Sequence, residues 1–131
     1  MKSIILTVTI FISFVSSGIA RKNQEDTIPT IGANMSLNTL IRATINNDIK
    51  LFKSVCVDNM KEAISAAQLT AVSKQLAIPM KQGYKKIFMG VLDRGSYKTY
   101  YWKIDFDKDG ISDMLAELSL GNKKVSGFII R

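Results

Sequence analysis

The stretch that decides the fold is YKTYYWKIDFDKDGISDMLAELSLGNKKVSGFII, residues 97–130. In its first part every second residue is aromatic or aliphatic: Tyr100, Trp102, Ile104 and Phe106. Alternation of this kind predicts a half-buried β-strand whose opposite face carries Tyr101 and Lys103. Asp107 to Gly110 then has the composition of a turn.

The same alternation continues on both sides of this strand. After the turn, the apolar side of the next strand carries Met114, Ala116, Leu118 and Leu120, while Asp113, Leu115 and Glu117 lie opposite. Gly121 to Lys123 forms another turn, and Val125 to Ile130 is the last strand. Upstream, a strand beginning at Tyr84 is expected to point Ile87, Met89 and Val91 to the apolar side, and Asp93 to Ser96 forms its turn. Four strands joined by short turns predict an antiparallel meander with one apolar face.

The segment before the strands has helical periodicity. Leu37, Leu40, Ile41 and Ile45 predict a helix over 36–45 capped by Ser36. The apolar stripe resumes at Ile49, Phe52, Val55, Cys56 and Met60, which predicts a second helix. Ser65 and Gln68 form a capping box for a third helix, which should end at Ile78 because Pro79 follows. Helices followed by strands predict an α+β fold, with the N-terminal helices packed on the apolar face of a curved sheet.

The first twenty residues have the features of a signal peptide. Lys2 gives a positive start, and Ile4 to Val15 is an apolar run too short to span a membrane easily. Gly18 and Ala20 are the small residues that signal peptidase needs before the cleaved bond. A retained membrane anchor is the alternative, but we expect cleavage after Ala20.

Cleavage would leave residues 21–35 as a flexible polar leader and residues 36–131 as a single α+β domain. We therefore expect a secreted, and in particular periplasmic, protein without a membrane span after signal cleavage. The formal net charge of +7 favours anionic partners such as envelope polymers, or is simply a solvated basic surface. We do not expect nucleic acid as a partner, because an exported domain rarely meets it.

The reactive residues are few. The chain has no histidine and one cysteine, which excludes Ser-His-Asp triads, histidine-ligated zinc and intrachain disulfides. Cys56 lies on the apolar stripe of the second predicted helix, so we interpret it as a small buried hydrophobe.

Two segments resemble a known family. A capped helix runs from Gln68 to Gly83 and leads into the meander, and the chain closes on NKKVSGFII, residues 122–130. This is similar to small exported bacterial domains of unknown function in the nuclear transport factor 2-like superfamily, which have a cystatin-like fold. The resemblance implies a curved sheet wrapped on a long helix, often with a pocket at its open end. Its members include polyketide cyclases, steroid isomerases, dimeric adaptors and accessory domains of secreted hydrolases.

One acidic loop has the spacing of a calcium site. Its candidate ligands occupy positions 1, 3, 5, 7 and 9 of such a loop: Asp105, Asp107, Asp109, Ile111 and Asp113. Gly110 stands where the sharp turn needs it, but Ala116 occupies position 12, where an EF-hand has glutamate. The alternative is a plain hairpin turn over 107–110. Calcium is the only cofactor that the sequence suggests.

A ligand pocket is predicted from four large side chains of the first two strands: Tyr84, Met89, Tyr100 and Trp102. The resemblance implies that an enzyme of this type would use an aspartate base and a tyrosine donor. The aspartates here fall in turns or at strand ends, so we assign no catalytic residue. The sequence therefore favours a non-catalytic binding or accessory domain, with an isomerase- or cyclase-type enzyme or a calcium-stabilised module as alternatives.

The outer sheet face offers a second surface. Tyr97 and Tyr101 are expected there, beside Lys98 and Lys103, and Leu115 would join them. Such a patch suits a protein partner, including a second copy of the chain. Surface tyrosines without a role would give the same pattern.

Overall fold

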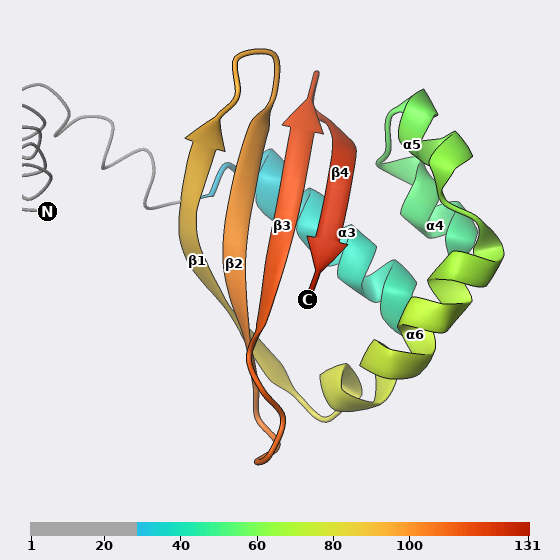
Figure 1. The fold of residues 1–131 in the computed structure, drawn as a ribbon, viewed down its shortest axis with the longest axis vertical. Helices are drawn as coiled ribbons and strands as arrows, with labels where there is room; N and C mark the ends of the chain where they lie inside the picture. Colours follow the sequence, from blue (N-terminus) through green and yellow to red (C-terminus); the bar gives the residue numbers. More distant parts are fainter. Residues whose placement is uncertain (1–28) are drawn as a thin grey trace, which may run out of the picture.

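Residues 29–131 run through four helices and then four strands (Figure 1). The computed structural model describes residues 29–131, so the predicted signal peptide and most of the predicted leader lie outside the described residues. The elements are α3 (Ile31–Asn46), α4 (Ile49–Ser54), α5 (Asp58–Ala63), α6 (Ala66–Lys81), β1 (Tyr84–Asp93), β2 (Lys98–Phe106), β3 (Met114–Gly121) and β4 (Lys124–Ile130).

The strands form one antiparallel sheet in the order β1-β2-β3-β4, which confirms the predicted meander. The predicted inner face of β2 is also confirmed, since Trp102 and Ile104 are at most 1% exposed. In the β3–β4 turn, Asn122 and Lys123 both have positive φ, as a two-residue hairpin turn requires.

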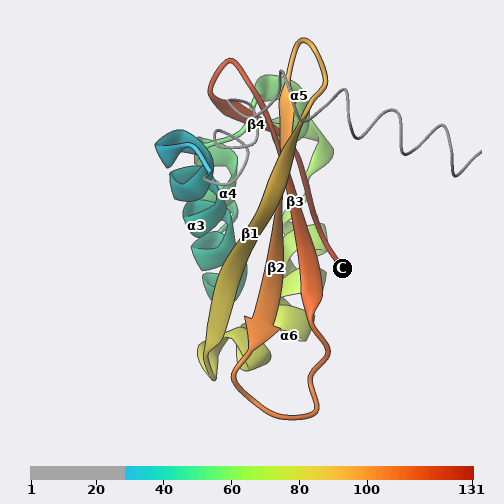
Figure 2. The same ribbon diagram turned by 90° about the vertical axis from the view of Figure 1, so that its left-hand side faces the viewer.

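Helices α3 and α4 lie on one side of the sheet (Figure 2). Helix α3 packs on the apolar face and buries Leu37 and Leu40 completely. Helix α6 packs mainly against α3 and runs beside the β4 end of the sheet (Figure 1). The predicted α+β arrangement is therefore confirmed, with α3 as the helix that covers the sheet.

The start of the first helix was predicted wrongly. Helix α3 begins at Ile31, and the Thr30 side chain caps it by accepting a hydrogen bond from the Ala33 amide at 3.1 Å. Ser36, the predicted cap, is buried inside the helix. Residues 31–35 therefore belong to the helix rather than to a leader, because Ala33 packs in the core.

The single helix predicted over Ile49 to Met60 is two short helices. The chain between α4 and α5 is extended, and Cys56 forms a parallel bridge with Val125 of β4. The Val57 amide donates to the Val125 carbonyl, and the Val125 amide donates to the Val55 carbonyl, both at 2.8 Å. Pairing with the sheet thus outweighs the helical periodicity of this segment.

Helix α6 has the predicted start and a different end. The Ser65–Gln68 capping box is confirmed. The helix continues through Pro79 to Lys81, because Met80 is buried and the Gln82 amide still reaches the Ile78 carbonyl.

The inner face of β1 was also predicted wrongly. Phe88 and Val91 face the core, while Ile87 and Met89 are exposed on the outer face. The pairing with β2 shifts between Phe88 and Gly90, so a β-bulge at Met89 breaks the alternation.

None of the helices within residues 29–131 has the length and apolar character that crossing a membrane requires.

Candidate functional site

The four predicted pocket residues do not share one pocket. Trp102 is 1% exposed and Tyr100 is 6% exposed, while Met89 is 63% exposed on the other face of the sheet. Tyr84 is partly buried against the core. Met89 lies on the opposite face because β1 alternates regularly from Tyr84, so that Tyr84 and Phe88 point inward and Met89 points outward.

The inner aromatic residues form a packed cluster instead. The rings of Phe88 and Trp102 meet edge to face with centroids 5.3 Å apart, and the Phe88 and Tyr100 centroids are 6.5 Å apart. Tyr100 and Trp102 also pack together, at 6.1 Å. Each such pair contributes about 0.5–1.5 kcal/mol beyond area burial. These ring contacts stabilise the core, and ligand binding by Tyr100 and Trp102 stays a prediction.

Tyr100 alone of the four reaches a cavity at the end of the sheet. This cavity has a volume of about 490 Å³ and lies beside the start of α3. Its remaining lining residues are Thr30, Gly32, Lys98, Leu120 and Lys123. The cavity has no lining carboxylate, so it does not assemble the aspartate–tyrosine pair of an isomerase.

A larger groove lies between the edge strand β4 and the helices α5 and α6. It has a volume of about 830 Å³, and none of its lining residues is charged: Asn59, Met60, Ala63, Ile64, Gln68, Ala71, Val72, Ser126, Gly127, Phe128 and Ile129. An adjoining cavity of about 370 Å³ shares Met60, Ile64, Val72, Phe128 and Ile129 with the groove. Sequence reasoning missed this groove, because it depends on where α6 lies relative to β4.

The outer sheet face carries several exposed apolar side chains. Ile87, Met89 and Leu92 are 43%, 63% and 47% exposed, and Ile129 of β4 is 48% exposed. A hollow of about 430 Å³ on this face is lined by Met89, Gly90, Val91, Leu92, Tyr101 and Leu115. Gly90 was the available signal, since a glycine inside a strand pattern often marks a bulge.

Of the residues predicted for this outer face, Tyr101 and Leu115 line the hollow. Tyr97 is 40% exposed and lies in the turn before β2 rather than in the strand. Lys98 lines the cavity at the end of the sheet instead.

The acidic loop does not form a gathered ligand set. Asp105 lies opposite Lys85 in the β1–β2 pairing, and the Asp113 carboxylate is 3.4 Å from the Lys103 ammonium. Across residues 29–131, no three histidine, cysteine, aspartate or glutamate side chains come together as metal ligands do. Asp109 and Ile111 lie in the segment that connects β2 and β3, and the calcium site and the plain turn both stay predictions, of which the Lys103–Asp113 pair favours the plain turn.

Asp107 has a local structural role. Its carboxylate lies over the Cα of Gly83, so that a Cβ at Gly83 would be 2.2 Å from Asp107 Oδ2. The Asp107 amide donates to the Gly83 carbonyl at 3.0 Å. The two residues hold the α6–β1 junction against the end of β2.

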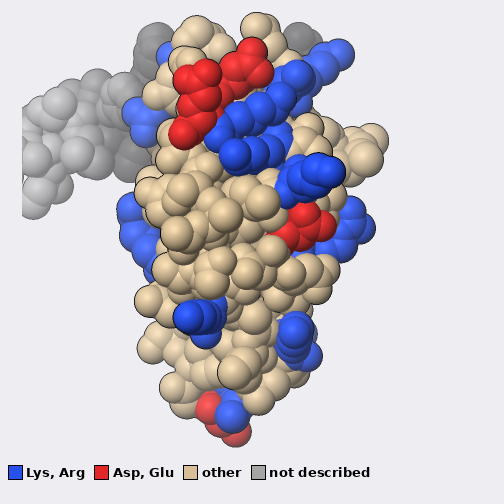
Figure 3. Space-filling view, turned by 90° about the vertical axis from the view of Figure 1, so that its right-hand side faces the viewer, with Lys and Arg blue, Asp and Glu red and all other residues tan. Residues whose placement is uncertain are grey.

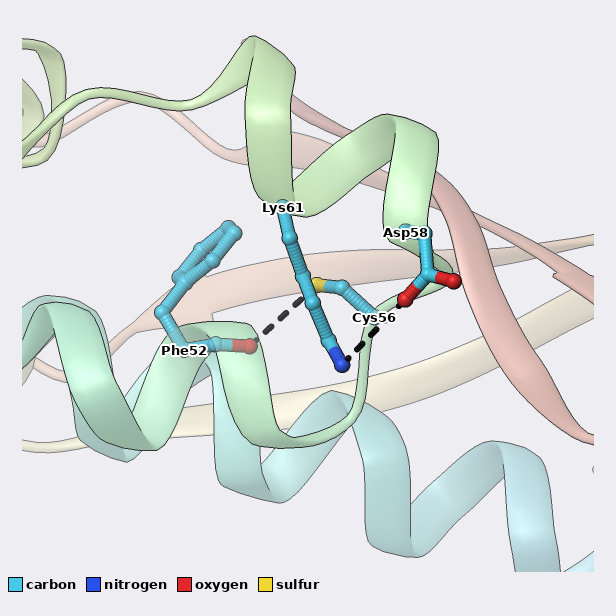
Figure 4. A network of polar contacts seen from close by, with 4 residues as sticks. All are labelled: Phe52, Cys56, Asp58 and Lys61. Atoms are coloured by element: carbon cyan, nitrogen blue, oxygen red, sulfur yellow. Dashed lines mark hydrogen bonds and ion pairs between the residues drawn. The ribbon is translucent and has the colours of Figure 1, made fainter.

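Cys56 is buried, which confirms its interpretation as a small hydrophobe. Its thiol donates to the Phe52 carbonyl at 3.2 Å, and Lys61 pairs with Asp58 nearby at 3.6 Å (Figure 4). Burial raises the pKa of the Cys56 thiol, while the charge of Lys61 lowers it to a smaller extent. The thiol is therefore not activated as a nucleophile.

Lys86 is the polar residue on the inner side of β1. Its ammonium donates to the side-chain oxygens of Asn34, at 3.1 Å, and Asn38. Desolvation lowers the pKa of Lys86. These contacts attach β1 to α3, and they give Lys86 a structural role.

The chain is similar to a solved structure of the cystatin fold. That structure is of an uncharacterized cystatin-fold protein from Novosphingobium aromaticivorans, 15% identical, with a TM-score of 0.36, covering 74% of this chain and 95% of the other. No family model matches the chain. No curated protein matches it either.

Proposed function

We propose that this chain is a secreted, non-catalytic binding domain that associates through its outer sheet face, and that a second copy of the chain occupies that face. The observation that carries the proposal is the set of exposed apolar side chains around the hollow at Gly90. Exposed apolar side chains gathered around one hollow are a feature of interaction sites. Secretion rests on the predicted signal peptide, and membership of the nuclear transport factor 2-like superfamily rests on the resemblance.

The charge of the face favours a second copy over a strongly charged partner. The chain as a whole carries +7, but the charged side chains near this face alternate in sign. Lys103 pairs with Asp113, Arg131 pairs with Glu117, and Lys85 lies opposite Asp105. A face of balanced charge meets its own copy without the like-charge repulsion that costs affinity elsewhere.

The test is the molecular mass of the purified protein in solution as a function of concentration, by sedimentation. We expect a dimer for the unmodified protein and a monomer for Met89→Lys, because the new charge would be buried in the hollow. The matched control is Ile78→Lys, which changes a residue 67% exposed on α6 and away from the sheet face. A monomer at all concentrations, or a dimer unaffected by Met89→Lys, would contradict the proposal.

A further inference from the structure

We propose that the groove between β4 and the helices α5 and α6 binds an extended, uncharged segment of a partner protein, which pairs with β4 as a fifth strand. This inference is independent of the outer-face proposal. It rests on three observations. Main-chain groups of β4 point away from β3, residues 55–57 already pair with the beginning of the same edge, and the residues that line the groove are uncharged.

The main-chain groups at the edge follow from the pairing of β4. Arg131 and Leu115 exchange both main-chain hydrogen bonds, at 3.0 and 2.7 Å. In an antiparallel ladder such pairs alternate with pairs whose N–H and C=O groups point away. The N–H and C=O groups of Phe128 and Ile130 therefore point away from β3. Among residues 29–131 no strand pairs with β4 on that side beyond the bridge at Val125.

A short segment of the chain itself already pairs with the beginning of β4, where a fifth strand would start. Val55 to Val57 pairs in parallel with Val125, through two hydrogen bonds of 2.8 Å. The chain then leaves the edge, because Asp58 begins α5. The groove continues along β4 from Ser126 to Ile129, so a partner segment would extend a strand line that the chain itself starts.

The walls of the groove determine the chemistry of that segment. Met60, Ile64 and Val72 form the helical side, and Phe128 lies on the strand side. All the lining residues are uncharged, although the chain has 18 basic and 11 acidic residues. Figure 3 shows this side of the molecule, where a band of uncharged atoms runs between groups of charged side chains. A charged segment would lose its hydration there without gaining a partner.

A strand fits this groove better than the other occupants. A small apolar molecule would cover the N–H and C=O groups of Phe128 and Ile130 and leave them unpaired, which is costly. The sheet of a second copy could not approach this edge, since α5 and α6 line the opposite side of the groove. A single extended segment both pairs with the edge and fills the space, as in strand addition to other sheets.

The experiment selects binders from a displayed library of random peptides of about eight residues, the length of a strand. The bait is the purified protein. We expect enriched peptides to be uncharged with alternating apolar residues. Val72→Lys should weaken their binding about tenfold or more, while Ile78→Lys, on the same helix outside the groove, should not.

Two further variants test main-chain pairing. Ile130→Pro removes the outward N–H of the edge strand, and Ile130→Val keeps it at similar volume. We expect Ile130→Pro to abolish peptide binding and Ile130→Val to retain it. Since Ile130→Pro could also unfold the protein, the same enriched peptide is methylated at alternate amide nitrogens. We expect this peptide to lose about tenfold or more in affinity for the unmodified protein.

Three results would overturn the inference. One is a library that yields no binder, or binders that tolerate Val72→Lys. Another is equal binding of the methylated and unmethylated peptides, which would indicate a site for small apolar groups. The third is a dimer that dissociates on Val72→Lys but not on Met89→Lys, which would assign the groove to a second copy. Failure of the outer-face proposal alone would leave peptide binding intact.

Discussion

The register of β1 against β2 gives the sharpest test of the fold, because it decides which of two adjacent residues supports the core. Phe88 packs against Trp102 and Tyr100, whereas Met89 is 63% exposed. We expect Phe88→Ala to lower the free energy of unfolding and Met89→Ala to leave it nearly unchanged.

The magnitude for Phe88→Ala follows from burial and aromatic contacts. Removing a partly buried phenyl ring costs about 2 kcal/mol in burial and cavity terms. Losing its pair with Trp102 adds about 1 kcal/mol, for about 3 kcal/mol in total. Met89→Ala is a surface change, for which about 0.5 kcal/mol or less is usual.

The assay is urea unfolding followed by tryptophan fluorescence, since the single tryptophan is Trp102 in this cluster. With a slope of about 1.5 kcal/mol per molar urea, Phe88→Ala should shift the midpoint by about 2 M and Met89→Ala by about 0.3 M or less. Measurements at two protein concentrations reveal any contribution from self-association. Equal shifts, or a larger shift for Met89→Ala, would show that Met89 rather than Phe88 faces the core, as the sequence suggested.

Three other predictions concern single features. Gly83→Ala should destabilise the protein by about 2 kcal/mol or more in the same assay, because φ is +111° and the new Cβ would meet the Asp107 carboxylate; a neutral effect would contradict the close approach. The raised pKa of the Cys56 thiol makes unfolding easier as pH rises above its ordinary value of 9.0, since the thiol then ionises only in the unfolded chain. Cys56→Ala should therefore show a smaller loss of stability between neutral pH and pH 10 than the unmodified protein, and identical pH profiles would refute the assignment. The melting temperature should be the same in millimolar calcium and in chelator, because the Asp113 carboxylate already faces Lys103; a clear rise with calcium would establish the loop 105–113 as a site.

The sheet topology could be predicted from the sequence because strand signals are local. The inner residues of β2 alternate without interruption, and short turns rich in aspartate, asparagine and glycine separate the strands. Neighbouring strands joined by such turns can pair only as a meander. The capping box at Ser65 is equally local, since it needs only two side chains three residues apart.

The errors arose where distant contacts outweighed local patterns. The apolar stripe from Ile49 to Met60 predicts one helix. Main-chain hydrogen bonds to Val125 instead hold the chain around Cys56 in an extended conformation. Burial of Ala33 begins α3 before the expected cap, and burial of Met80 carries α6 past Pro79. In each case a contact from another part of the chain supplied more free energy than the local preference.

The sequence by itself determined the order of the elements and the apolar face of β2, because periodicity is a property of neighbouring residues. Its composition also determined that the chain has no histidine and one cysteine. Only the tertiary structure decided which residues of β1 face the core, since a one-residue bulge lets Phe88 and Val91, which strict alternation would place on opposite faces, both pack there. It also decided where the two surfaces that we propose for binding lie. The groove beside β4 and the apolar outer face are formed by residues from distant segments of the chain. Local sequence patterns do not predict how such segments pack against one another.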